Sequence, residues 1–318
     1  MLEFSVIVPT YKRPELLRSC LEAMAPERQG VAPDRYEVIV CDDEASEETR
    51  GVVLRSLAGA VYTVGPRKGP AANRNHGARL AQGRWLVLTD DDCIPCAGWL
   101  AAFANALRPD CLVYEGRTTC AEGLLSPLEY APINETGGYL WSCNFIIDSS
   151  LFRSLGGFDE GFPHAAMEDV DFRERLTDHG FGWNFVPEAA INHPPRTLRL
   201  STLLAGHESY YYYLIVRCGT IPKLWRVLMN IAKTRVKAFF RPVWWRDLPK
   251  AVSLIVAELA SVCFYHHPWR TKFSAAAPDS VRQSNQTHRQ VIVQEGSGFA
   301  DADGPRVARF TPSSSRKS

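Results

Sequence analysis

Three short runs of the chain are almost continuously apolar. They are residues 4–9 (FSVIVP), 36–41 (YEVIVC) and 85–89 (WLVLT). This pattern is typical of strands in a parallel sheet, because helices cover both faces of such a sheet and nearly every side chain is buried. We therefore expect three buried, parallel strands.

Between these runs the apolar positions follow helical spacing. Helices are expected over residues 14–25, from about residue 46 onward, and from residue 70 to about residue 80. In the first of them the apolar stripe consists of Leu17, Cys20, Leu21 and Met24. Alternating strands and helices predict an α/β fold, with a Rossmann-like, mainly parallel sheet flanked by helices.

Polar residues follow each expected strand. The first run continues into Pro9, Thr10, Tyr11, Lys12 and Arg13, the second into Asp42, Asp43 and Glu44, and the third into Asp90, Asp91 and Asp92. In parallel α/β sheets, ligands bind beyond the carboxyl ends of the strands. One edge of the sheet is therefore expected to gather carboxylates, hydroxyls and basic groups.

The three consecutive aspartates suggest a cation. If the strand pattern continues, Asp90 and Asp92 point to one side and Asp91 to the other. Two close carboxylates raise each other's pKa unless a positive charge lies between them, and Mg²⁺ or Mn²⁺ supplies one with a preference for oxygen ligands. A solvated acidic turn is the alternative.

The charge is unevenly distributed. The whole chain has a net charge of +1, yet residues 1–193 contain 17 Lys and Arg against 28 Asp and Glu, while residues 194–250 contain 11 against 2. The acidic first part argues against a nucleic-acid partner. The basic second part contains an amphipathic helix pattern over residues 221–239, and a further apolar segment follows it over residues 251–265. Residues 210–265 are therefore expected either to contact a membrane surface or to pack on the rest of the protein.

Localisation is predicted from weaker signals. The chain enters its first strand without a basic and apolar leader, and its nine cysteines show no disulfide-like rhythm. We therefore expect a cytoplasmic protein, peripheral on the inner face of the membrane if residues 210–265 bind lipid. The apolar runs are interrupted, which predicts no spanning helix. Residues 271–318 are rich in Ser, Gln, Arg and Pro and are predicted to be a disordered tail.

Five motifs occur in a fixed order over about residues 3–195: SVIVPTYKRPELL, EVIVCDDEASEET, GPAANRNHGARLAQGRWLVLTDDDCIP, LGGFDEGF and MEDVDFRERL. Together they resemble the family 2 glycosyltransferases, which have the GT-A fold. The resemblance implies metal-dependent, inverting transfer from a nucleotide-diphosphate sugar, with UDP favoured, to a hydroxyl of a glycan, lipid-linked or other acceptor. The QxxRW motif of processive members is absent, which favours transfer of a single sugar.

We divide the chain accordingly. Residues 1–200 are the expected GT-A domain, with a nucleotide-sugar half over 1–115 and an acceptor half over 116–200. Residues 201–270 are the expected basic and aromatic helical extension.

The resemblance also implies roles for individual residues. Asp169 is the expected general base, with Glu168 as second choice. The expected ligands of Mn²⁺ or Mg²⁺ are Asp90, Asp92 and His193; His193 lies 24 positions after Asp169. The donor is expected to contact Pro9, Thr10, Tyr11, Arg13, Asp43 or Asp42, Lys68, Arg74 and Asp91. The acceptor is expected at Trp141, Asn144, Gly157, Phe158 and Asp159.

Two other functions compete with this one. A nucleotidyltransferase would use similar metal and nucleotide chemistry, but it should have a glycine-rich loop after the first strand, where this chain has VPTYKRPE. A non-catalytic nucleotide-sugar-binding protein would keep the binding residues but would not need a general base.

Overall fold

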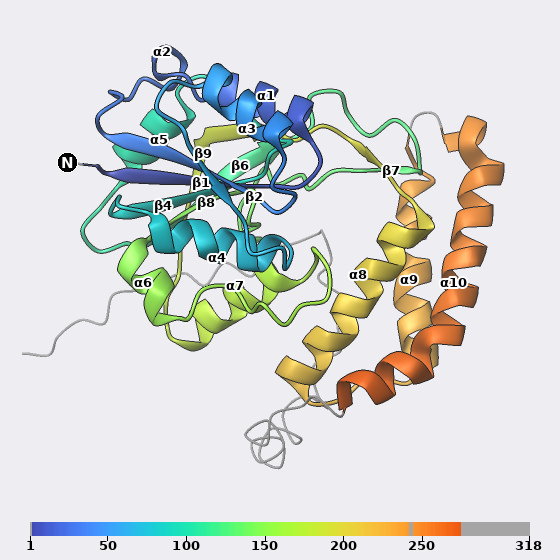
Figure 1. Cartoon of the computed structure of the whole chain (residues 1–318). Helices are drawn as coiled ribbons and strands as arrows, with labels where there is room; N and C mark the ends of the chain where they lie inside the picture. The colour runs from blue at the N-terminus through green and yellow to red at the C-terminus, as the bar shows by residue number, and fades with distance from the viewer. Residues whose placement is uncertain (1, 242–243, 275–318) are drawn as a thin grey trace, which may run out of the picture.

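The computed structural model describes residues 2–241 and 244–274. It contains an eight-stranded mixed sheet with helices on both faces (Figure 1). The strand order is β3-β2-β1-β4-β8-β6-β9-β5, and the first four of these strands are parallel. β8 runs antiparallel to both β4 and β6. The predicted α/β class with a mainly parallel sheet is confirmed.

The strands of this sheet are β1 (Phe4–Thr10), β2 (Tyr36–Asp42), β3 (Val61–Val64), β4 (Trp85–Thr89), β5 (Ile94–Pro95), β6 (Val113–Thr119), β8 (Asn144–Asp148) and β9 (Asn184–Asn192). A separate ribbon pairs β7 (Glu129–Tyr130) with β10 (Arg196–Thr197). The helices are α1 (Pro14–Ala23), α2 (Pro26–Gln29), α3 (Glu47–Ser56), α4 (Pro70–Leu80), α5 (Trp99–Ala106), α6 (Ser149–Ser154), α7 (Glu168–Asp178), α8 (Leu200–Tyr213), η1 (Leu214–Cys218), α9 (Leu224–Ala238) and α10 (Trp244–Ser274).

The three apolar runs are β1, β2 and β4, and the three helical patterns are α1, α3 and α4, as predicted. Every residue of β1 and β4 is buried, which explains their continuous apolar character. Helix starts follow from local chemistry. Pro14 and Pro70 occupy the first turns of α1 and α4, and the Ser46 hydroxyl accepts a hydrogen bond from the Thr49 N–H at the start of α3.

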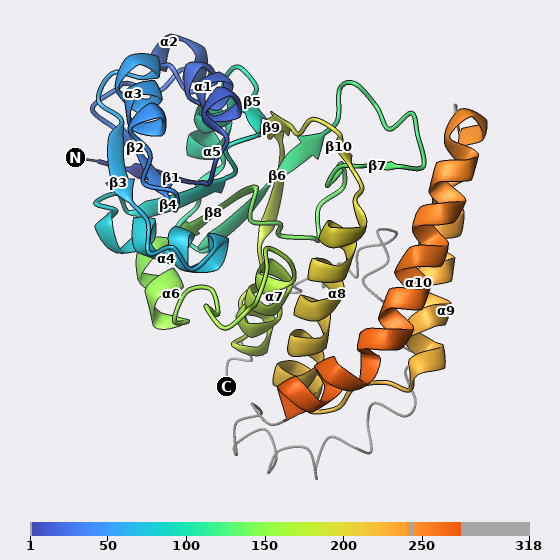
Figure 2. The same ribbon diagram turned by 45° about the vertical axis from the view of Figure 1, so that its right-hand side comes forward.

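Two hydrophobic cores lie on the two faces of the sheet. The first packs α1, α3 and α5 against the sheet, and the second packs α4, α6 and α7 on the opposite face (Figures 1 and 2). This layering leaves the carboxyl ends of β1, β2 and β4 uncovered at one edge, which is the position of ligand sites in such sheets.

A third cluster joins α8, η1, α9 and α10 into a helical layer beside the sheet domain (Figure 2). Tyr211 is fully buried within this layer. Tyr212 donates a hydrogen bond to Asp159, and Tyr213 donates one to Glu174, so α8 is attached to the sheet domain. For α8, therefore, the alternative of packing on the rest of the protein is the one observed.

Helix α10 bears on the prediction that no helix spans a membrane. Residues Trp245–Ser274 are long and apolar enough to cross one, judged by length and composition alone. Length and composition do not test whether the helix spans, so the absence of a spanning helix stays a prediction. The predicted tail, residues 271–318, lies outside the described residues except for its first part, which ends α10. The proposed domain boundaries stay predictions.

Helix α4 lies very close to the sheet at Gly77. A Cβ atom added there would lie 2.6 Å from Ile7 Cγ2 and 2.9 Å from Cys41 Sγ, and both of these side chains are fully buried. We expect Gly77→Ala to lower the free energy of unfolding, because overpacking costs about 1–3 kcal/mol and outweighs the better helix propensity of alanine. Urea denaturation measures the change.

Gly206 in α8 provides the matched control, since nothing lies within 4 Å of a Cβ added there. We expect Gly206→Ala to be neutral or stabilising by up to about 1 kcal/mol. Equal stability of the two variants would contradict the close packing at Gly77.

Candidate functional site

A cavity of about 1160 Å³ lies at the carboxyl ends of β1, β2 and β4. The residues that follow these strands line it, together with the starts of α4, α7 and α8. Ligand pockets commonly enclose about 300–1,000 Å³, so the space suits a nucleotide sugar with part of an acceptor.

The three aspartates after β4 are all bound by neighbouring side chains, and Arg13 pairs with both Asp91 and Asp92. Asp90 Oδ1 lies 2.5 Å from Arg74 Nη2, and Asp91 Oδ2 accepts a 2.7 Å hydrogen bond from the Thr10 hydroxyl. Asp92 Oδ2 accepts hydrogen bonds from Arg13 Nη1 at 3.0 Å and from Arg196 Nε at 2.8 Å. β4 ends at Thr89 and the chain turns, so the expected alternation of Asp90 and Asp92 against Asp91 does not apply here.

Arg74 connects two parts of the site. It projects from α4, is only 4% exposed, and lies between Asp90 and Glu168, whose Oε1 is 3.2 Å from Arg74 Nη1. Burial by itself lowers the pKa of Arg74, but the two carboxylates outweigh that effect and raise it. Burial raises the pKa of Asp90, but Arg74 and Arg196 outweigh it and lower the pKa to about 2. The Arg74–Asp90 pair is therefore ionised at neutral pH.

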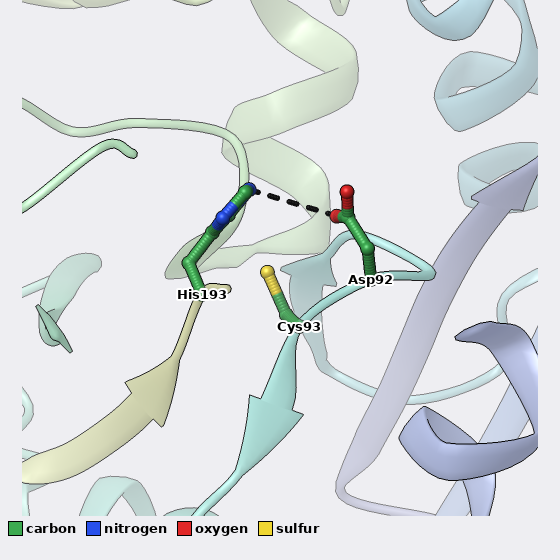
Figure 3. A group of neighbouring side chains, drawn as sticks. All are labelled: Asp92, Cys93 and His193. Carbon is green, nitrogen blue, oxygen red and sulfur yellow. Dashed lines mark ion pairs between the residues drawn. The ribbon is translucent and has the colours of Figure 1, made fainter. Parts of the chain in front are cut away.

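A candidate cation site lies beside the aspartate turn. Ligating atoms of Asp92, Cys93 and His193 lie within 4.8 Å of one another, and His193 Nε2 is 3.6 Å from Asp92 Oδ1 (Figure 3). His193 Nδ1 is 2.9 Å from the Pro194 carbonyl oxygen, which can only accept a hydrogen bond. Nδ1 therefore carries a proton, and Nε2, on the side of Asp92, is the nitrogen that could bind a cation.

The residues present fit a hard divalent cation. Asp92 is 3% exposed, and its Oδ1 is a buried oxygen without a hydrogen-bond partner among the described residues. Asp92 oxygen and His193 nitrogen suit Mn²⁺ or Mg²⁺, whereas the Cys93 thiol is a softer donor. Asp90 was predicted as a ligand alongside Asp92, but its carboxylate bonds to Arg74 instead and lies outside this group.

Two adjacent carboxylates begin α7 and line the cavity. Burial, assisted by the neighbouring Asp169, raises the pKa of Glu168 to about 7. Burial also raises the pKa of Asp169, although Arg74 opposes the shift. Asp169 Oδ1 accepts a 2.8 Å hydrogen bond from the Val170 N–H, a group at the helix start. A carboxylate whose pKa is raised in this way can take up a proton near neutral pH.

Backbone strain is concentrated around the cavity. Met167, which precedes α7, has φ of 75°, and four further non-glycine residues of the described chain have positive φ: Lys12, Ala45, Arg67 and Leu140. All five lie in loops close to the site. Residues in sparsely populated φ/ψ regions tend to cluster at ligand sites, where the surrounding structure holds them in place.

Most of the predicted donor residues line the cavity: Pro9, Thr10, Tyr11, Arg13, Asp43 and Arg74. Asp43 also shapes it, because its carboxylate accepts hydrogen bonds from the N–H groups of Arg67 and Gly69 at 3.0 and 2.9 Å. These contacts fix the loop that leads into α4.

Other predicted site residues lie outside the lining: Asp42, Lys68, Asp91, Asp92, Asn144, Gly157, Phe158 and Asp159. Asp42 is fully buried and accepts hydrogen bonds from the Ser46 N–H and the Tyr62 hydroxyl. Asn144 binds the indole N–H of Trp99 on the α5 face. Of the predicted acceptor residues, only Trp141 lines the cavity.

The sequence motifs missed Arg196, which binds Asp92 and lines the cavity. Arg196 follows His193 by three positions, so a basic residue just after a candidate ligand was the available signal. Tyr130 from β7 and Ser201 from α8 also line the cavity without having been predicted.

Comparisons with known proteins agree with this geometry. Residues 5–124 match the family model described as Glycosyl transferase family 2. Validoxylamine A glucosyltransferase of Streptomyces hygroscopicus subsp. limoneus is 28% identical over 221 residues, 55% of this chain and 48% of that protein. Pre-mycofactocin glycosyltransferase of Mycobacterium tuberculosis is 34% identical over 148 residues, 41% of this chain and 31% of that protein. The chain thus spans about half or less of the length of these relatives.

Among solved structures, the mannosyltransferase PcManGT from Pyrobaculum calidifontis, in complex with GDP-Man and Mn²⁺, superposes with a TM-score of 0.51 at 19% identity. The match covers 90% of this chain and 88% of that one. At this identity the likeness concerns the fold. Residues 5–124 thus match glycosyltransferase family 2, and the superposition agrees with the GT-A fold that the motifs implied.

Proposed function

We propose that this chain transfers one sugar from a nucleotide-diphosphate sugar, a UDP-sugar, to an acceptor hydroxyl with inversion at the anomeric carbon. The acceptor is a glycan, a lipid-linked glycan or another hydroxyl compound. The observation that carries the proposal is that Asp169, Arg74, Asp90 and His193 line one cavity at the nucleotide-binding edge of the sheet.

Asp92 and His193 would hold a divalent cation, Mn²⁺ or Mg²⁺. A bound cation supplies stabilisation of the negative charge that develops on the leaving diphosphate. Arg13 and Arg196 lie beside Asp92 and are the nearest further cations for the phosphate oxygens. The solved structure of PcManGT, which contains Mn²⁺ with GDP-Man, supports a cation at this edge of the fold.

Asp169 accepts the proton of the acceptor hydroxyl. The acceptor oxygen then forms a bond to the anomeric carbon, and the bond from that carbon to the diphosphate oxygen breaks on the opposite side. We assign the base to Asp169 because the neighbouring Glu168 already binds Arg74 through Oε1. Glu168 Oε2 is buried without a hydrogen-bond partner among the described residues and suits an acceptor hydroxyl.

The alternatives are less well supported. The family match and the glycosyltransferase relatives do not favour a nucleotidyltransferase. A non-catalytic binding protein would not need two carboxylates, Glu168 and Asp169, brought to the cavity at a helix start that is strained by the positive φ of Met167.

Asp169→Asn is expected to lower kcat by about 10²–10⁴-fold, because the amide cannot accept the proton. Donor binding should change little, since the proposed donor contacts lie elsewhere in the cavity. Asp178→Asn, at the exposed end of the same helix, is the control and should retain activity. Undiminished turnover of Asp169→Asn would exclude it as the base.

The pH profile should reflect the partly buried base. Only ionised Asp169 accepts a proton, and its folded-state pKa is raised, so kcat/KM is expected to fall as the pH drops through that raised pKa. Activity should already be lost where an ordinary aspartate, with a pKa of about 3.9, is still mostly ionised. A profile that stays flat down to about pH 4 contradicts the assignment.

Chelation should abolish turnover, and His193→Ala should raise the Mn²⁺ concentration for half-saturation by about tenfold or more. Mn²⁺ binding is measured directly by electron paramagnetic resonance, which does not depend on activity. His179→Ala, at the exposed end of α7, is the control. Full turnover in EDTA rules out metal dependence.

Thermal shifts with UDP-, GDP- and dTDP-sugars identify the donor, because a ligand stabilises the folded protein by RT ln(1 + [L]/Kd).

A further inference from the structure

The outward face of α9 is unusually apolar for a solvent-facing helix. Trp225 is 57% exposed, Met229 and Val236 are similarly exposed, and Phe240, just after the helix, is 85% exposed. These positions recur at spacings of four and seven residues, so they share one face. The opposite face packs inward through Val227 and Ile231.

Helix α10 has a matching outward face. Trp245, Val252, Val256 and Phe264 are exposed, with values from 46% to 72%, and only 17% of the apolar window of this helix is buried. In both views α9 and α10 lie on the side of α8 away from the sheet (Figures 1 and 2). The two faces therefore belong to the outer side of the same helical layer.

Acidic and basic side chains of this layer differ in exposure. Residues 214–274 contain two acidic side chains, and both are bound to the protein. Glu258 is buried and binds Arg235 and His207, while Asp247 accepts a hydrogen bond from Ser126. In contrast, the exposed cations of the layer include Arg226, Lys233, Arg246, Lys250 and Arg270. The outer side thus presents apolar and aromatic groups among positive charges.

We propose that the outward faces of α9 and α10 bind an anionic lipid bilayer in its interfacial region. Tryptophan and phenylalanine surrounded by Lys and Arg are the typical composition of a helix that lies in this region, and anionic headgroups complement the exposed cations. The inference goes beyond glycosyl transfer and does not depend on it.

Interfacial binding fits better than spanning. Glu258 lies in the middle of α10 and is tied to α8 through His207 and to α9 through Arg235. A spanning α10 would break these contacts and bring an unpaired carboxylate into hydrocarbon. Pro249 and Pro268 lie inside the same helix.

The lipid-binding faces are connected to the cavity. Arg241 and Asp247 bind the turn at Ser126, which carries the exposed Leu125 and leads into β7. Tyr130 of β7 lines the cavity. A bilayer on this side would therefore lie beside the chain segment that leads to the acceptor end of the site.

Flotation of the full chain with vesicles tests the proposal. Phosphatidylcholine vesicles with about 30% phosphatidylglycerol should bind the protein, and pure phosphatidylcholine vesicles should not. An Arg226→Gln, Lys233→Gln, Arg246→Gln variant should partition about hundredfold less, because the loss of each cation near an anionic surface lowers partitioning about fivefold. A Trp225→Ser, Phe240→Ser, Phe264→Ser variant should lose binding as well.

The control variant carries Arg50→Gln, Leu54→Ser and Arg55→Gln on α3, and should bind as the native chain does. Because all substituted residues are exposed or part-exposed on the surface, Mn²⁺ binding should stay unchanged in every variant, which separates failure of docking from failure of the site.

Absence of flotation, or equal losses in the control, overturns the proposal. So does resistance to carbonate extraction, which indicates spanning, or a native dimer that the aromatic variant dissociates, which indicates a second copy as the partner.

Discussion

The ion pairs of Arg74 hold the site together. This one guanidinium neutralises Asp90 at the end of β4 and Glu168 at the start of α7, two segments far apart in the sequence. Around it, five carboxylates face three arginines: Asp90, Asp91, Asp92, Glu168 and Asp169 against Arg13, Arg74 and Arg196. If all were ionised, the site would have an excess of two negative charges. Burial is the largest cause of the raised pKa values of Asp91 and Glu168, both about 7, and the neighbouring carboxylates add to it. A divalent cation would match the excess of negative charge.

The fold concentrates these charges because parallel strands end at the same edge. Helices cover both faces of the sheet, so the chain reaches solvent at the strand ends, and polar residues can gather there without disturbing the cores. Keeping several like charges close requires a stiff frame. The positive φ values of Met167 and Leu140 and the hydrogen bonds that Asp43 accepts from its neighbouring loop belong to that frame.

The sequence predicted part of this arrangement. The continuous apolar runs gave β1, β2 and β4 almost to the residue, since burial on both faces leaves a pattern that needs no tertiary knowledge. β6 and β9 mix polar with apolar residues and were not found by the same pattern. In the site, one cavity is lined by four residues that the motifs suggested: Arg74, Asp90, Asp169 and His193. Motifs do not distinguish side chains that face a ligand from side chains that lie behind them. Asn144 supports Trp99 instead, and Arg196 resembled any surface cation until the fold brought it to Asp92.

Arg196 belongs to β10, and the chain continues from β10 directly into α8. Its bond to Asp92 therefore ties the first segment of the helical layer to the sheet by charge. Asp92 Oδ1, which faces His193, is left for a divalent ion, while Oδ2 is bound to Arg196. The positive charge of such an ion would weaken the attraction between Asp92 and this guanidinium, so occupancy of the sheet edge and attachment of the helical layer are coupled through one carboxylate.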